Sequence, residues 1–293
     1  MAPAAEPPAR NDAVPEGLVL IPTPLGNLGD MTSRAIATLR AADLALCEDT
    51  RVTARLCAVW GINTRLSPLH DFNEDSRIDG ILQMLRQGRR VALVSDAGTP
   101  LVSDPGFRLV RAAIAAGLPV GALPGPNAAV LALVLSGLPP QPFLFLGFPA
   151  PKSAARRAEF FRLRAAEKAG LAATMIWYEA PHRLAETLVD AAAVFGDRPA
   201  AVARELTKRF EEVRRDSLPA LAAYYAGHAA RGEICLVVGP APAEATPDAD
   251  VDALLRAALA TGSVKQAVAD VTAATGLPRK QVYARALAMQ GEG

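Results

Sequence analysis

The chain has 293 residues, of which 51% are hydrophobic and 21% charged, a composition typical of folded proteins that excludes wholesale disorder. Lys and Arg number 31 against 30 Asp and Glu, so the formal net charge of +1 excludes a global basic field that would attract nucleic acid. Binding of a nucleic acid of any kind would therefore depend on local clusters of basic side chains. The length predicts two domains with a small appendage.

The N-terminal part of the chain begins with residues 1–16, which are rich in Pro, Ala and Glu and predict a disordered tail. From residue 17, short apolar runs alternate with segments whose apolar residues lie three or four apart. The runs, expected as strands, are 18–21, 44–47, 91–95, 118–123 and 143–148. The segments expected as helices are 32–42, 78–87 and 107–116. This alternation is typical of a parallel sheet covered by helices, so we predict a first α/β domain over 17–148.

A second series of elements begins after the stretch PAPKSAARR (149–157), which interrupts the first pattern. The expected helices are 153–169, a segment after Pro181, and 218–225. The expected strands are 174–179, 200–205 and 233–239. The series predicts a second α/β domain with a mixed sheet over 149–240.

The C-terminal part starts with a linker-like stretch at 240–250, rich in Pro, Ala and Asp. Beyond it we predict a helical domain over 250–293, with two short helices joined at 276–278. Such a pair is typical of a helix-turn-helix domain and also of a helical hairpin that packs on the body of a protein. Both interpretations remain open.

The cysteines and the lengths of the apolar runs indicate the compartment. Cys47, Cys57 and Cys235 have no CxxC spacing, which argues against a disulfide framework and favours a reducing environment. The three histidines have no ligand-like spacing with them, so no metal site is predicted. No run approaches the ~20 apolar residues of a membrane span. We therefore expect a cytoplasmic protein with no membrane partner.

Three loops rich in Gly and Pro follow expected strands, at 22–32, 95–106 and 123–127. Loops at the carboxyl edge of an open α/β sheet are where such folds bind ligands, and small residues let a ligand approach the backbone. Neither GxGxxG nor a P-loop pattern occurs, so a dinucleotide or triphosphate site is poorly supported. The alternatives are a structural crossover, or a turn in which Asp96 or Asp104 caps a helix.

Charged and aromatic side chains end two strands of the second series, in WYEAPHR (177–183) and RELTKRFEE (204–212). They are candidates to close a pocket between the domains, or they form a solvated charged edge. His70 lies next to Asp71 in a loop, a pairing that can bring an imidazole pKa close to neutral pH, although a surface histidine is the simpler interpretation.

A string of motifs in a fixed order carries a resemblance to a known family. The motifs are IPTPLGNLGDMTSRA, CEDTRVTARLC, SDAGTPLVSDPG, LPGPNAA, SGLP, FLGFPAPK, YEAPHR, RELTKRFEE and GEICLVVG. Over roughly residues 17–240 the chain resembles the small-subunit ribosomal RNA (cytidine-2′-O)-methyltransferase family, within the tetrapyrrole methylase superfamily.

The resemblance implies a tetrapyrrole-methylase-like fold (class III methyltransferase) of two α/β domains with a small C-terminal helical segment. It also implies a homodimer and S-adenosylmethionine bound in the cleft between the domains, which explains the missing GxGxxG. The cofactor contacts implied by the motifs are Pro24, Ala97, Gly98, Thr99, Val102, Asn127, Ala128, Glu179 and Leu206. Thr99 stands where tetrapyrrole-modifying relatives carry Asp, which favours RNA over a porphyrin as the acceptor.

The implied reaction is methylation of a cytidine ribose 2′-hydroxyl in 16S ribosomal RNA or the small ribosomal subunit. A hydroxyl needs a nearby base, for which Asp49 and His70 are the candidates, with Glu48 behind them. Arg51 and Lys208 are candidates to hold the adjacent phosphate. Where the family often has a second histidine near His70, this chain has Phe72, which argues against a catalytic histidine pair.

The C-terminal segment resembles a small extra domain of the same family. Lys265, Arg279, Lys280 and Arg285 give it a face suited to phosphate contacts. Two alternatives remain open at this stage: a tetrapyrrole C-methyltransferase with the same cofactor cleft, and a helix-turn-helix regulator that senses a small ligand.

Overall fold

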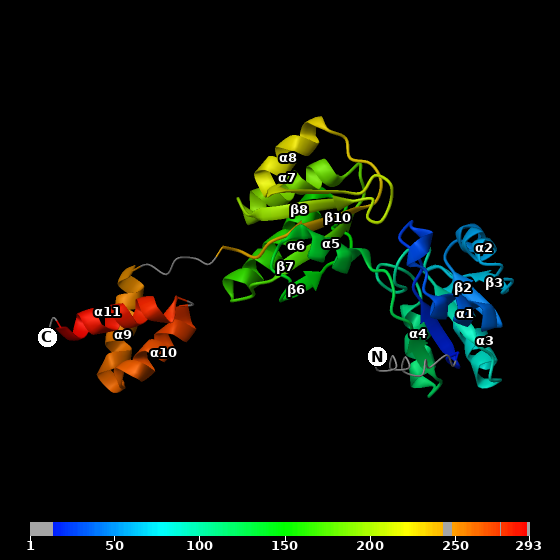
Figure 1. The fold of residues 1–293 in the computed structure, drawn as a ribbon, viewed down its shortest axis with the longest axis horizontal. Coiled ribbons are helices and arrows are strands. Elements are labelled where there is room, and N and C mark those ends of the chain that lie inside the picture. Colours follow the sequence, from blue (N-terminus) through cyan, green and yellow to red (C-terminus); the bar gives the residue numbers. More distant parts are fainter. Residues whose placement is uncertain (1–13, 243–247, 276, 292–293) are drawn as a thin grey trace, which may run out of the picture. The chain divides into compact units, whose positions relative to one another are not determined.

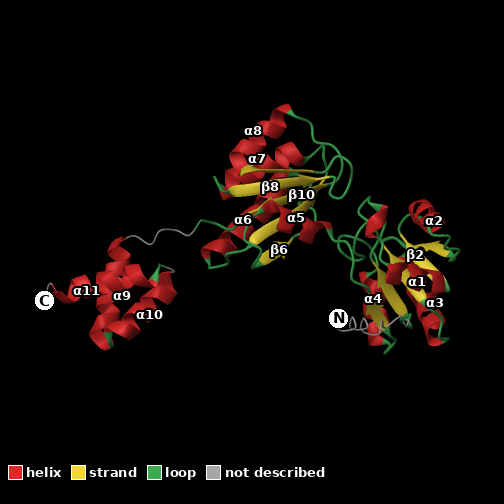
Figure 2. Cartoon of the chain, viewed as in Figure 1, coloured by secondary structure: helices red, strands yellow, loops and turns green. Residues whose placement is uncertain are grey.

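The computed structural model describes residues 14–242, 248–275 and 277–291, so most of the expected tail at 1–16 lies outside the described residues. The chain forms two units, 1–240 and 241–293, which are drawn as ribbons in Figure 1 and coloured by secondary structure in Figure 2. Within the described residues, no helix has the length and apolar composition that a membrane crossing needs.

The first sheet consists of five parallel strands in the order β3-β2-β4-β1-β5. They are β1 (Leu18–Ile21), β2 (Leu44–Cys47), β3 (Leu66–Pro68), β4 (Val91–Val94) and β5 (Val120–Ala122). Alternate side chains of a strand point to opposite faces, so Leu18 and Leu20 enter one buried cluster and Val19 and Ile21 another. A sheet buried on both faces explains why β1, β2 and β4 are uninterrupted apolar runs.

Helices cover both faces of the first sheet. One face packs against α3 (Glu74–Arg86) and α4 (Phe107–Ala115), through residues such as Ile81 and Leu109. The other packs against α1 (Ser33–Ala41) and α2 (Thr50–Val59), through residues such as Leu39. A short 3₁₀ helix, η1 (Leu28–Asp30), lies in the loop between β1 and α1. Thr32 caps α1, since its Oγ1 accepts the Ala35 N–H at 3.1 Å.

The second sheet is mixed and has the order β6-β7-β10-β8-β9. Its strands are β6 (Phe143–Phe145), β7 (Thr174–Glu179), β8 (Pro199–Arg204), β9 (Glu212–Ser217) and β10 (Ile234–Val238). Only the β6–β7 pair is parallel among these described strands. One face packs against α6 (Ser153–Lys168), α7 (Leu184–Phe195) and α8 (Leu218–Gly227) around the buried Phe160.

The change from one sheet to the next falls earlier than the sequence suggested. The run 143–148, expected as the last strand of a first domain ending at 148, supplies β6, which pairs with β7 of the second sheet. Helix α5 (Ala128–Ser136) also packs on the second sheet, through Ala132 and Leu133 against Ala201 and Val237. The expectation that 143–148 belongs to the first sheet was therefore wrong, because an apolar run does not tell which sheet it joins.

The described residues of the C-terminal unit form three helices where the sequence suggested two. They are α9 (Asp248–Thr261), α10 (Val264–Thr275) and α11 (Arg279–Gly291). Their apolar faces meet in a core of their own that includes Val251, Leu255, Val268 and Val282. Lys265, Arg279 and Lys280 are exposed, whereas Arg285 is half-buried and lies 3.7 Å from Asp252.

Candidate functional site

Three loops meet at the carboxyl edge of the first sheet because their strands β4, β1 and β5 are neighbours. Backbone hydrogen bonds join Thr23, after β1, to Gly98, after β4, at 2.9 and 3.0 Å. The Thr23 hydroxyl also donates to the Ser95 carbonyl at 2.9 Å. The Thr99 hydroxyl donates to the Pro126 carbonyl, after β5, at 2.8 Å. These bonds hold the three loops as one rigid edge.

The backbone of the loop after β4 has left-handed conformations that a ligand site can exploit. Gly98 has a φ of +84°, and an added Cβ would lie 3.1 Å from the Leu25 side chain. Leu101 and Ser103 also have positive φ, at 70° and 67°, although neither is a glycine. Such strained residues cluster at functional sites, where the surrounding structure holds them in place.

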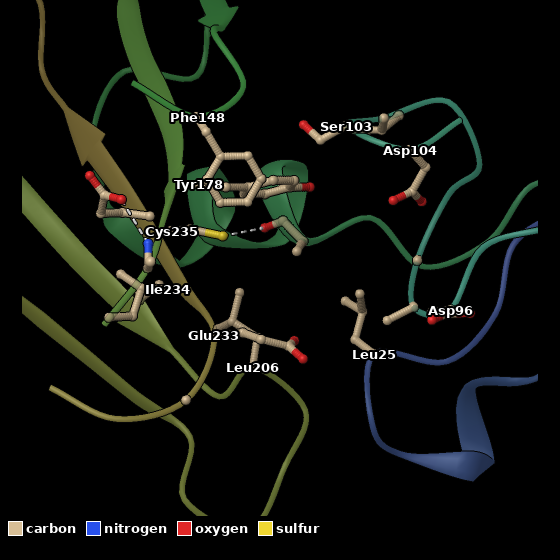
Figure 3. A pocket seen from close by; sticks show the side chains of 18 of the residues that line it. Leu25, Asp96, Ser103, Asp104, Phe148, Tyr178, Leu206, Glu233, Ile234 and Cys235 are labelled. Carbon is tan, nitrogen blue, oxygen red and sulfur yellow. Dashed lines mark hydrogen bonds between the residues drawn. The ribbon is translucent and has the colours of Figure 1, made fainter. Parts of the chain in front are cut away.

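A cavity of about 360 Å³ opens above this edge, within the size range of small-molecule sites. Figure 3 shows its two sides: Leu25, Asp96 and Asp104 lie on loops of the first sheet, and Tyr178 and Cys235 lie on the second. The backbone at 97–99 and the N-terminus of α5 also line it, as do the ends of β7 and β8. We call this the first cavity.

The side of the first cavity that belongs to the second sheet is largely apolar and aromatic. The Tyr178 ring packs edge-on against Phe148 at 5.7 Å between ring centroids, and both line the cavity (Figure 3). Burial raises the pKa of the Tyr178 hydroxyl and raises that of the Cys235 thiol to about 12. Both groups are therefore neutral at pH 7 and add no charge to the cavity.

The charges of the first cavity are all of one sign. Its lining includes four carboxylates, Asp96, Asp104, Glu179 and Glu233, and no Lys or Arg among the described residues. Burial is the main cause that raises the pKa values of Asp96 and Asp104 above the usual range. Glu179 is buried and bonded to the Arg183 guanidinium, with Nε at 2.8 Å. Glu233 lies 3.2 Å from the Lys208 ammonium, so Asp96 and Asp104 are the carboxylates whose charge favours a cationic ligand and disfavours a phosphate.

A second cavity of about 400 Å³ lies beside the first and shares Leu25, Asp96, Ala97 and Glu233 with it. Its other walls are the loop after β1, one face of α2, and Lys208. Unlike the first cavity it has two basic side chains, Arg55 and Lys208.

Lys208 connects the loops of the two sheets at this point. Its Nζ lies 3.0 Å from the Glu205 carboxylate and 3.2 Å from that of Glu233. Its aliphatic chain lies against Gly26, where an added Cβ would be only 2.7 Å from Lys208 Cε. Burial opposes the charge of Lys208, but the bonds to the two carboxylates outweigh it and raise its pKa. Lys208 is thus a cation with its partners already in place.

The structure brings most of the expected cofactor contacts together. Of the nine, the ones that line the first cavity are Ala97, Gly98, Thr99, Val102, Ala128, Glu179 and Leu206. Pro24 lines the second cavity, and Asn127 caps α5, where its Oδ1 accepts the Val130 N–H at 3.1 Å. Whether these residues contact a cofactor remains a prediction.

The expected acid, base and phosphate-binding residues are less well placed. Among Glu48, Asp49, Arg51, His70 and Lys208, only Lys208 lines either cavity. Asp49 caps α2 and forms a bidentate bond with the exposed Arg51, which holds the pKa of Asp49 far below its usual range. A carboxylate with so low a pKa is a poor proton acceptor. Burial raises the pKa of Glu48, and the charges of Asp96 and Asp104 add to that effect.

Several residues at the cavities were not singled out from the sequence as site residues, chiefly Asp96, Asp104, Tyr178 and Glu233. Asp96 and Asp104 belong to the loop that the sequence marked as a candidate ligand loop, with a helix cap as the alternative role for either residue. The N-cap of α4 is in fact Gly106. In the described part of the chain, no three His, Cys, Asp or Glu side chains are grouped so that they could hold a metal ion.

Comparison with known proteins gives two family matches along the chain. Residues 17–222 match the family model described as Tetrapyrrole (Corrin/Porphyrin) Methylases. Residues 245–290 match the model described as RsmI C-terminal HTH domain.

Two relatives of similar length have the same name. A protein of Mesorhizobium japonicum called "Ribosomal RNA small subunit methyltransferase I" is 44% identical over 94% of this chain and 94% of its own length. A protein of the same name from Micromonospora olivasterospora is 47% identical over 91% of this chain and 85% of its own. Among solved structures, cobalt precorrin-4 methyltransferase has a TM-score of 0.55 at 17% identity, over 76% of this chain and 94% of that one. At that identity the likeness concerns the fold alone.

Proposed function

This chain belongs to the tetrapyrrole methylase family, and from that premise we propose that it methylates a cytidine ribose 2′-hydroxyl in 16S ribosomal RNA. The chain is a methyltransferase, and its methyl donor is S-adenosylmethionine. The observation that carries the proposal is the 44% identity, over nearly the full length of both chains, to a ribosomal RNA small subunit methyltransferase.

The two alternatives have weaker support. A tetrapyrrole acceptor is suggested by the family description and by solved structures at 17% identity, which concern the fold alone. A regulator that senses a small ligand is disfavoured because the long matches are to methyltransferases.

The first cavity fits the donor. S-adenosylmethionine, when bound, supplies a methyl group carried on a positively charged sulfonium. The carboxylates of Asp96 and Asp104, which form no ion pair among the described residues, give the cavity the opposite charge. The close backbone at Gly98 leaves space that any side chain at that position would occupy. We propose that the backbone at 97–99 and the apolar wall of Tyr178 and Phe148 hold the nucleoside part.

Asp96 is the carboxylate best placed to accept the proton of the hydroxyl. It lines both cavities, and its Oδ1 accepts the Asp49 backbone N–H at 3.1 Å, which fixes its orientation. Among the described residues no donor is bonded to Oδ2, so that oxygen is available to a substrate hydroxyl. Burial raises the pKa of Asp96, which makes it a stronger base than an exposed aspartate. In this scheme the backbone N–H of Asp49 orients Asp96, and Glu48 and His70, which line neither cavity, take no part in the proton transfer.

We propose further that the protein acts in the cytoplasm, as a homodimer, on the small subunit or its RNA. The C-terminal unit is suited to contact phosphates through Lys265, Arg279 and Lys280, which are exposed basic side chains on a chain of nearly zero net charge. Sedimentation of the purified protein tests the dimer: a single species of monomer mass at micromolar concentration would contradict it.

Transfer of label from S-adenosylmethionine tests the reaction itself. The purified protein is incubated with the labelled donor and either small ribosomal subunits or a tetrapyrrole. We expect label in ribosomal RNA only, in a dinucleotide that resists alkaline hydrolysis because a 2′-O-methyl group blocks cleavage. Label in the tetrapyrrole, or in an RNA base, would contradict the proposal.

A further inference from the structure

Helix α2 has two faces with different surroundings. Cys57 is buried in the core of the first sheet. Together with the buried Thr53, the stripe of Val52, Arg55, Leu56 and Val59 lines the second cavity. These positions are spaced three and four residues apart, so they form one continuous surface on the helix. Val52 and Val59 remain 39% and 55% exposed, which leaves apolar surface open to a ligand.

The two cations of the second cavity differ in their partners. Lys208 is bonded to Glu205 and Glu233. Arg55 is exposed, and among the residues that the structure describes no carboxylate forms an ion pair with it. Arg55 is therefore the side chain in this cavity whose charge is available to an anionic ligand, and a guanidinium suits the geometry of a phosphate.

Methyl transfer requires that the acceptor oxygen come within about 3–3.5 Å of the methyl group. The acceptor must then occupy space that adjoins the donor, and the second cavity shares Leu25, Asp96 and Ala97 with the first. A nucleotide combines an apolar base with an anionic phosphate. The apolar stripe of α2 and the cation of Arg55 offer both kinds of contact on one helix.

We propose that the second cavity is the binding site of the acceptor nucleotide. The base packs on Val52, Leu56 and Val59, an adjacent phosphate binds Arg55, and the ribose lies at the wall shared with the first cavity. The inference rests on the proposed RNA methylation and extends it by assigning the acceptor to α2. In this proposal α2 binds the acceptor nucleotide through side chains that do not contact the donor.

Two variants test the assignment: Val59→Trp, which fills the second cavity, and Arg55→Ala, which removes its available cation. Ile114→Trp on α4 and Arg86→Ala on α3 are matched controls at exposed positions outside both cavities. For each variant, calorimetry gives the dissociation constant of S-adenosylmethionine, and methyl transfer gives kcat and the KM for small ribosomal subunits.

We expect Val59→Trp to raise the KM for small subunits at least ~10-fold, as loss of the base contacts of one pocket does. S-adenosylmethionine binding should stay within about twofold, which also shows that the variant is folded. For Arg55→Ala we expect a higher KM and a salt dependence of log KM that is shallower by about 0.7, the value for one phosphate contact to single-stranded RNA. The controls should match the unaltered protein.

Unchanged KM values and salt slopes in both variants, with active unaltered protein, would overturn the assignment of the second cavity and leave the proposed methylation standing. Unaltered protein that transfers no methyl group to ribosomal RNA would instead overturn the proposed function, and the assignment with it. If Val59→Trp fails to bind the donor, the KM and salt dependence of Arg55→Ala alone test the assignment of the second cavity. That variant should fold, since an exposed arginine contributes little to the stability of the fold.

Discussion

The two cavities of the 1–240 unit have similar volumes, about 360 and 400 Å³, and share a wall, yet their charges differ. The first has carboxylates and no basic side chain among its described lining residues, whereas the second has Arg55 and Lys208 as well. A sulfonium donor is cationic and an RNA acceptor is anionic. This difference in charge, and not a difference in size, is the basis on which we assign the first cavity to the donor and the second to the acceptor.

A substitution of Asp96, in the wall that the two cavities share, should have the largest effect on turnover. Asp96→Asn keeps the size of the side chain and an oxygen for the Asp49 N–H, but removes the base. We predict a fall in kcat of about 10²–10⁴-fold, the usual contribution of a general base. Binding of S-adenosylmethionine, measured by calorimetry, should weaken as well, because the first cavity loses one of its carboxylate charges. A variant with normal turnover would show that Asp96 is not the proton acceptor.

A larger side chain in the first cavity should have the next largest effect, on the affinity for S-adenosylmethionine. In Gly98→Val the new side chain meets Leu25 and is strained by the positive φ. We predict that the dissociation constant of S-adenosylmethionine rises at least ~10-fold. Gly88→Ala is the control, because Gly88 also has a positive φ, of +75°, but has open space around it. Equal donor affinities in the two variants would argue against a donor site at 97–99.

The pH dependence of kcat is a further test of Asp96 as the proton acceptor. Its active form is deprotonated, and burial raises its pKa above that of an ordinary aspartate. Turnover should therefore fall as the pH drops through this raised pKa, at a higher pH than a free aspartate would require. A rate profile measured on the folded protein checks this, and Asp96→Asn should remove that limb. The same limb in the variant would assign the titration to another group.

The smallest effect is expected at Asp49, outside both cavities. Its side chain caps α2 and binds Arg51, and its low pKa makes it a poor base. We predict that Asp49→Ala keeps kcat within about threefold, because the backbone N–H that orients Asp96 remains, and lowers the melting temperature slightly through loss of the cap. A loss of turnover as large as that of Asp96→Asn would reverse the two roles.

The sequence was most informative where local chemistry decides the structure. The loops after β1, β4 and β5 were found because Gly and Pro end the strands, and Asn127 and Thr32 cap helices as their residue types predict. Strand β9 and helix α2 were not expected. The sheet that β6 joins could not be inferred, because a short apolar run fits either sheet equally well.

The choice among acidic residues depends on tertiary structure. Glu48, Asp49, Asp96 and Asp104 all follow strands of the first sheet, so the sequence places them all at the same edge. Only the folded chain distinguishes Asp49, which caps a helix, from Asp96, which lines both cavities. The start of α2 carried one usable signal, since an Asp before a helix is a preferred N-cap.

Mass spectrometry of nucleosides from 16S ribosomal RNA tests the central claim most directly, in cells that make this protein and in cells that lack it. We predict that one 2′-O-methylcytidine is present in the first and missing in the second, and that it returns with the unaltered gene but not with Asp96→Asn. Identical nucleoside profiles in the two kinds of cell would contradict the claim.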